Sequence, residues 1–259
     1  MSFTSGIITY YPGLGNHDIT NNHPAGGGSC SYWSWPPANI LVCAVAAYGY
    51  KTCCSATMLK IQFYDLDHKP YGLKSVADPG AAYSWVRDGY RFLQLNWDPT
   101  IDWIVAINVF QQTRLGPYMD WFENQLREAQ ADRQKVVIYI HHVQEWLTSD
   151  ARFTRLLRDY PVSLILQGHV HNLFGARYIL QGVPVVFSGA AEYLSYLEVG
   201  YRSTGIQVSL FVARANAQRK TVASWTYTLG ANGKINNTDV GRAFSFDPNN
   251  MADHDPIPR

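Results

Sequence analysis

The feature that most constrains the fold of this chain is a pair of short apolar runs, residues 135–140 and 162–166, that each end at histidines. Both runs are rich in Val, Ile and Leu, a composition typical of buried strands. A helix is expected between them, over residues 150–159, with Ser149 or Asp150 as its cap. This order indicates an α/β fold, in which polar residues that follow strands converge on ligands.

The rest of the chain adds more strands than helices. Residues 83–95 alternate around Asp88-Gly89, which is the strongest short-range signal for a β-hairpin. A second helix is expected after Gly116-Pro117, with one apolar stripe along it. The segment after His171 is β-rich, and strands are expected at 177–180, 184–188, 194–199, 205–214 and 221–229. A sandwich of two mixed β-sheets flanked by helices fits this order.

Composition excludes several classes of protein. Hydrophobic residues make up 47% of the 259 residues and charged residues 16%, so bulk disorder is excluded. The net charge of +1 provides no general attraction to nucleic acid or to an anionic membrane, and no nucleic-acid partner is expected. No apolar run approaches the roughly 20 residues that span a bilayer, and the N-terminus does not resemble a signal peptide. A secreted protein remains compatible with the sequence if a leader lies upstream.

Three polar clusters follow predicted strands and indicate a metal site. Imidazole nitrogens and amide oxygens are suitable ligands for borderline divalent metals. A single histidine at a strand end is usually structural, but three such clusters in one chain favour a shared site. The clusters are Gly15-Asn16-His17-Asp18, which follows a strand expected at 7–11, then His141-His142, then Gly168-His169-Val170-His171.

Taken together, these motifs resemble those of the calcineurin-like metallophosphoesterase superfamily, over roughly residues 7–229. The resemblance implies a fold that holds two divalent metal ions and hydrolyses phosphate esters, with phosphodiesters as the expected substrates. The segments 83–96, 121–126 and 188–197 look like a secreted subgroup that includes phosphatidylinositol phospholipase C-like enzymes. Phospholipase C-like action is therefore the finer expectation.

The resemblance also implies roles for individual residues. Asn16, His141 and His169 would bind one metal ion, and His171 would bind the other. His142 is the alternative to His141 if the end of the strand is shifted by one residue.

Two further residues of the first motif receive roles from the same resemblance. His17 would not be a ligand but would protonate the leaving oxygen. Asp18 is expected to support the loop from outside the ligand set.

The chain departs from the family pattern before Gly15. Family members carry an Asp-x-His and a Gly-Asp motif upstream, whereas residues 1–14 contain no Asp and no His. The carboxylate that bridges the two metals and the first strand-helix-strand portion of the fold are therefore missing. Three interpretations stay open: a fragment or an incorrect gene start, a non-catalytic relative, or a site completed by another chain or a later carboxylate. The chain alone is expected to bind metal weakly and to turn over slowly.

The expected domain organisation is a phosphoesterase domain over residues 1–230, incomplete at its N-terminus, followed by a polar tail over 231–259. Within the domain, residues 21–55 form an irregular insertion rich in Cys and Trp. Its aromatic residues Tyr32, Trp33 and Trp35 either pack the insertion onto the core or contact a membrane surface. A non-catalytic binding module that uses this insertion is the alternative function. The insertion also holds all four cysteines, as disulfides or as free thiols: Cys30, Cys43, Cys53 and Cys54.

Overall fold

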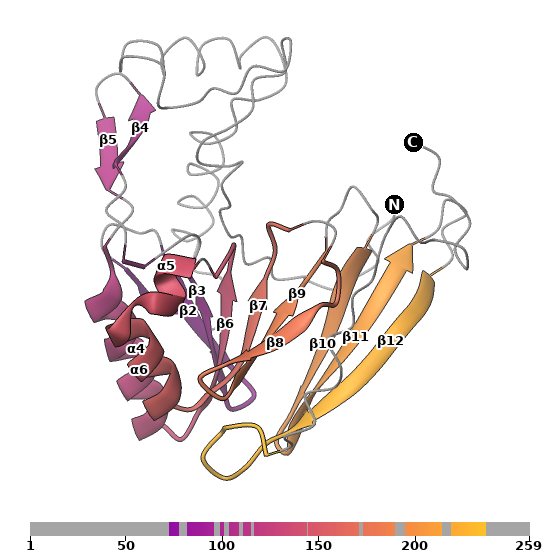
Figure 1. Ribbon diagram of the computed structural model, residues 1–259. Helices are drawn as coiled ribbons and strands as arrows, with labels where there is room; N and C mark the ends of the chain where they lie inside the picture. Colours follow the sequence, from indigo (N-terminus) through magenta and orange to yellow (C-terminus); the bar gives the residue numbers. More distant parts are fainter. Residues whose placement is uncertain are drawn as a thin grey trace, which may run out of the picture.

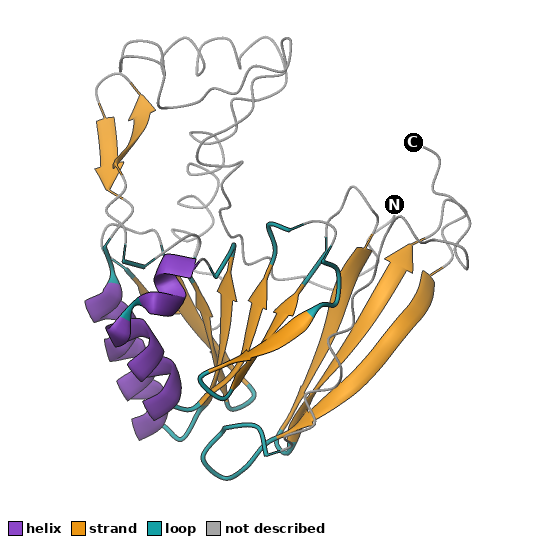
Figure 2. Ribbon diagram, viewed as in Figure 1, coloured by secondary structure: helices purple, strands orange, loops and turns teal. Residues whose placement is uncertain are grey.

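The computed structural model describes the chain from residue 73 to residue 236, with gaps. The described ranges are 73–77, 82–95, 99–100, 104–108, 111–114, 117–143, 145–170, 173–189, 195–213 and 219–236. This part of the chain is α/β. A seven-stranded sheet carries helices on one face and a three-stranded sheet on the other (Figures 1 and 2). The strand expected at 7–11 and the insertion at 21–55 lie outside the described residues.

The seven-stranded sheet is mixed, with the strand order β1-β2-β3-β6-β7-β9-β8. Strands β3, β6, β7 and β9 are parallel to one another, and β1, β2 and β8 pair antiparallel with their neighbours. The carboxyl ends of the four parallel strands therefore meet at one edge of the sheet. The strand bounds are β1 Leu73–Val76, β2 Tyr83–Arg87, β3 Tyr90–Gln94, β6 Lys135–Ile140, β7 Val162–Gln167, β8 Arg177–Leu180 and β9 Val183–Phe187.

The hairpin predicted around Asp88-Gly89 is confirmed as the β2–β3 pair. Arg87 pairs with Tyr90 across the turn, so the loop has two residues. Asp88 and Gly89 adopt φ angles of 50° and 79°, which is the left-handed conformation that a tight hairpin of this kind requires.

The described helices are α4 Met119–Ala131, α5 Glu145–Ser149 and α6 Ala151–Asp159. Of the two candidate caps of α6, Asp150 is the residue used, because its side chain accepts a hydrogen bond of 2.7 Å from the backbone N–H of Phe153. None of these helices is long and apolar enough to cross a membrane.

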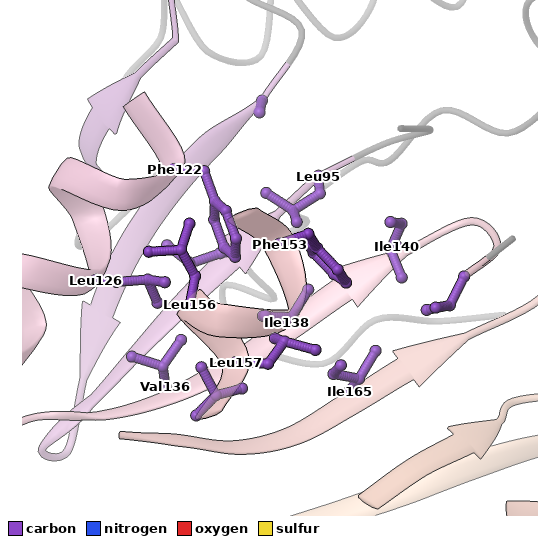
Figure 3. Close-up of a cluster of buried hydrophobic side chains, with 14 of the residues drawn as sticks. Leu95, Phe122, Leu126, Val136, Ile138, Ile140, Phe153, Leu156, Leu157 and Ile165 are labelled. Carbon is purple, nitrogen blue, oxygen red and sulfur yellow. The ribbon is translucent and has the colours of Figure 1, made fainter. Parts of the chain in front are cut away.

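The two faces of the seven-stranded sheet form two cores, because successive residues of a strand point to opposite faces. On the helix side, Phe122 and Leu156 lie in one buried cluster with Ile138 and Ile165 (Figure 3). On the other side, Val137 belongs to a cluster that includes residues of the three-stranded sheet. Strands β6, β7 and β9 are mostly buried on both faces, which explains their largely apolar sequence.

The second sheet consists of β10 Ser195–Arg202, β11 Gly205–Ala213 and β12 Arg219–Thr228. The expectation of two mixed sheets flanked by helices is correct only for the first sheet. In the described part of the chain, the second sheet is entirely antiparallel, and the described helices contribute no residue to its buried clusters. The reason is visible in β10, where buried or half-buried residues alternate with exposed ones, so that only one face has a packing partner.

The sequence analysis did not predict the strands β4 Ile104–Asn108 and β5 Gln111–Arg114. They pair antiparallel and form a separate two-stranded sheet.

Candidate metal centre

The topology brings two of the predicted clusters together. Strands β6 and β7 are parallel neighbours, and the ladder between them ends at the pair Ile140 and Gln167. His141 and His169 follow these strands, so both emerge at the carboxyl edge of the sheet. The backbone N–H of Gly168 donates a hydrogen bond of 3.0 Å to the carbonyl of His141, which holds the two chain segments side by side.

The rings of these two histidines meet through their nitrogens. The distance between Nε2 of His141 and Nδ1 of His169 is 3.0 Å, and the ring planes are inclined by 77°. His169 has a φ angle of 65°, in the left-handed region that non-glycine residues rarely adopt. Such conformations persist where the surrounding structure holds them, and they cluster at functional sites.

His142 contacts the ring of His169 in a different way from His141. Its imidazole stacks on that of His169, with centroids 4.5 Å apart and planes inclined by 25°. Within the described part of the chain, its Nδ1 is buried without a hydrogen-bond partner. Burial, and secondarily the nearby charge of His169, lower the pKa of His142, which favours a neutral ring at pH 7.

Gln167 is a residue of this site that the sequence analysis did not identify. Its buried side chain accepts a hydrogen bond of 2.9 Å at Oε1 from the backbone N–H of Val143, just beyond the two histidines. The signal that could have revealed it is a glutamine directly after the apolar run Leu164–Leu166 of strand β7.

The structure thus brings His141, His142 and His169 together. The other predicted site residues, Asn16, His17, Asp18 and His171, lie outside the described residues, and so do Tyr32, Trp33, Trp35 and the cysteines. Among the described residues, no group of three or more His, Cys, Asp or Glu side chains is arranged to hold a metal ion. The described histidines can therefore supply part of a ligand set, and all the ligand roles stay predictions.

Comparison with known proteins shows a distant similarity to a solved structure. No protein-family model matches the sequence, and no curated protein matches it. Among solved structures, the chain is similar to a dimetal phosphatase from Danio rerio, with 14% sequence identity and a TM-score of 0.40. The match covers 58% of this chain and 61% of that chain, less than two thirds of its length. At this identity and TM-score the similarity assigns no activity to this chain.

Proposed function

We propose that this protein is a metal-dependent hydrolase of phosphate esters, with phosphodiesters as its main substrates. The observation that carries the proposal is the 3.0 Å approach of His141 Nε2 to His169 Nδ1 at the ends of neighbouring parallel strands. The sequence supports it independently, because the motifs around Asn16, His141 and His169 follow one another in the order that metallophosphoesterases use.

The two nitrogens fit a shared divalent metal ion. Ligand bonds of about 2.0–2.1 Å at a tetrahedral angle separate two nitrogens by about 3.3 Å. The observed 3.0 Å between His141 and His169 is within a few tenths of an ångström of that value, so small ring rotations would accommodate a metal ion. Imidazole nitrogens are also chemically appropriate donors for divalent metal ions such as Zn²⁺ or Fe²⁺.

The remaining residues of the motifs would add further groups to the proposed site. Asn16 would add an amide oxygen beside His141 and His169, and His171 would bind a second metal ion. Bound divalent ions would polarise the phosphate oxygens and supply a hydroxide at neutral pH. His17 would donate a proton to the leaving oxygen as its bond to phosphorus breaks.

A finer proposal concerns the substrate. The segments 83–96, 121–126 and 188–197 resemble those of phosphatidylinositol phospholipase C-like enzymes, which supports a lipid phosphodiester as substrate. The test is to compare hydrolysis of phosphatidylinositol in vesicles with hydrolysis of bis(p-nitrophenyl) phosphate. Activity on the soluble diester alone would remove the lipid from the proposal.

The general proposal is tested with the purified chain and added Mn²⁺. We expect slow hydrolysis of bis(p-nitrophenyl) phosphate that EDTA abolishes, that His169→Ala removes, and that a control substitution on the exposed face of α6, Arg158→Ala, leaves unchanged. Metal binding without turnover would favour the non-catalytic alternative. Turnover that survives both EDTA and His169→Ala would contradict the proposal.

A further inference from the structure

We propose that Gln167 is a positioning residue, which sets the orientation of His141 towards His169 by holding the turn that follows β6. The consequence of this positioning for metal binding rests on the proposed function. Its effect on the two imidazole rings can be measured in the metal-free protein.

The side chain of Gln167 is 2% exposed and has two hydrogen-bonding partners. Oε1 accepts from the backbone N–H of Val143 at 2.9 Å, and Nε2 donates to the hydroxyl of Tyr178 at 3.4 Å. The backbone N–H of Val143 can only donate, so it fixes the amide with its oxygen towards Val143, and Nε2 is left to face the hydroxyl of Tyr178, which can accept.

These contacts anchor the histidine turn at both of its ends. At the start of the turn, the carbonyl of His141 accepts from the N–H of Gly168 at 3.0 Å. At the end, the N–H of Val143 binds the side chain of Gln167. The backbone ladder between β6 and β7 ends at Ile140 and Gln167, so this side chain extends the hydrogen bonding past the last ladder pair. The turn from His141 to Val143, which carries both histidines, is therefore held against β7.

The surroundings explain why a glutamine is needed at this position. Val143 is buried in the same apolar cluster as Leu147 and Ile165, where an N–H without an acceptor is unfavourable. An apolar residue in place of Gln167 would fill similar volume but would leave this N–H unpaired. The turn would then move to find another partner, and His141 would move with it.

A structural role alone would make Gln167 equivalent to other buried glutamines, and the chain offers one for comparison. Gln125 on α4 is also 2% exposed, and its Oε1 accepts from Ser84 at 2.6 Å and from Arg91 at 3.0 Å. Gln125→Met removes buried side-chain hydrogen bonds on helix α4, away from the histidine turn. It is the matched control for Gln167→Met.

The experiment uses the full-length chain in EDTA and measures cross-peaks between the ring protons of His141 and His169 by nuclear Overhauser spectroscopy. In the wild type, rings with centroids 5.0 Å apart should give these cross-peaks. We expect Gln167→Met to lose them and Gln125→Met to keep them. Gln167→Glu keeps an acceptor oxygen for Val143 and should keep them as well. Cross-peaks retained in Gln167→Met would overturn the proposal.

Two further measurements keep the proposal testable and separate it from the proposed function. If Gln167→Met does not fold, hydrogen exchange of the wild-type Val143 amide decides, since slow exchange is expected and fast exchange would overturn the hydrogen bond. Titration with Co²⁺ should show affinity reduced about 10–100-fold in Gln167→Met, and less than twofold in Gln125→Met. A wild type that binds no Co²⁺ would contradict the proposed function while the metal-free spectra still decide the role of Gln167. A wild type that does bind Co²⁺, but no more tightly than Gln167→Met, would overturn the positioning role alone.

Discussion

His142 stacks its ring on the imidazole of His169, with centroids 4.5 Å apart, whereas His141 directs Nε2 to within 3.0 Å of His169 Nδ1. Adjacent histidines therefore contact the same ring in different ways. A nitrogen-to-nitrogen approach suits two ligands of one metal ion, while a stacked ring supports the orientation of its neighbour. This difference favours His141 over His142 as the ligand and leads to the first prediction.

Replacing His141 should weaken metal binding more than replacing His142. Residues that only support a ligand typically change metal affinity about 10–100-fold. We expect His142→Ala to stay within that range and His141→Ala to exceed it, as measured by competition between the protein and a chromogenic chelator. If His142→Ala has the larger effect, the assignment of the ligand must be exchanged.

His17→Ala should slow some substrates more than others. A positioned acid contributes roughly 10²–10⁴ in rate where the leaving oxygen needs a proton. Alkyl esters should therefore lose far more activity than nitrophenyl esters, with metal content nearly unchanged, whereas His169→Ala should affect both substrates alike. The measurement is rate against leaving-group pKa, and parallel lines for wild type and His17→Ala would remove His17 from the mechanism.

Glu123 should contribute stability that disappears in acid. Its carboxylate, 8% exposed on α4, pairs with Arg152 on α6 at 2.8 Å and with Arg127 at 2.7 Å. The hydrogen bond from Arg152 is the main reason that the pKa of Glu123 lies below its ordinary value of 4.5. Because the pKa is lowered in the folded state, the stabilisation is complete above pH 4.5 and is lost as the pH falls through the folded value.

Glu123→Gln should lower the free energy of unfolding at pH 7 by about 1–2 kcal/mol, between the values for exposed and for fully buried ion pairs. Urea denaturation at pH 7 and in acid measures both the loss and its disappearance at low pH. The control is Glu145→Gln, an exposed residue of α5, which should change little. An equal loss at both pH values would show that the charge of Glu123 is not the cause.

Because of Lys234, the free energy of unfolding should rise as the pH increases from about 8 to 10. Its ammonium donates to the carbonyl of Leu157 near the end of α6, and burial lowers its pKa from 10.5 to about 8. Between these values the unfolded chain binds a proton that the folded protein has released, so stability rises with pH through this window.

Lys234→Met should remove that rise. The buried hydroxyl of Tyr90, with a pKa raised to about 12, acts in the opposite direction above pH 10, so the comparison is made between pH 8 and 10. The measurement is the difference in unfolding free energy between wild type and variant. A difference that stays constant across this range would contradict the role given to Lys234.

Much of the local structure could be predicted from the sequence, because local chemistry determines it. Asp88-Gly89 permits few conformations other than a tight turn, and Asp150 offers an oxygen where the first turn of α6 lacks an acceptor. The strand order and the antiparallel second sheet could not be predicted. The alternation in β10 indicates one buried face but does not say whether a helix or a sheet covers it.

The candidate site shows the same division. The strand-end positions of His141 and His169 followed from the apolar runs before them, and adjacency of β6 and β7 turns those positions into a contact. Gln167 escaped notice because its role depends on a hydrogen bond to a turn on another strand, and such a bond leaves no periodic pattern in the sequence.

The central claim is that His141 and His169 bind the same divalent metal ion, and anomalous diffraction from crystals grown with Mn²⁺ tests it most directly. We predict an anomalous peak within about 2.0–2.3 Å of both His141 Nε2 and His169 Nδ1, with the two nitrogens separated slightly beyond their metal-free distance. A map with no peak at these nitrogens, from protein saturated with Mn²⁺, would contradict the account.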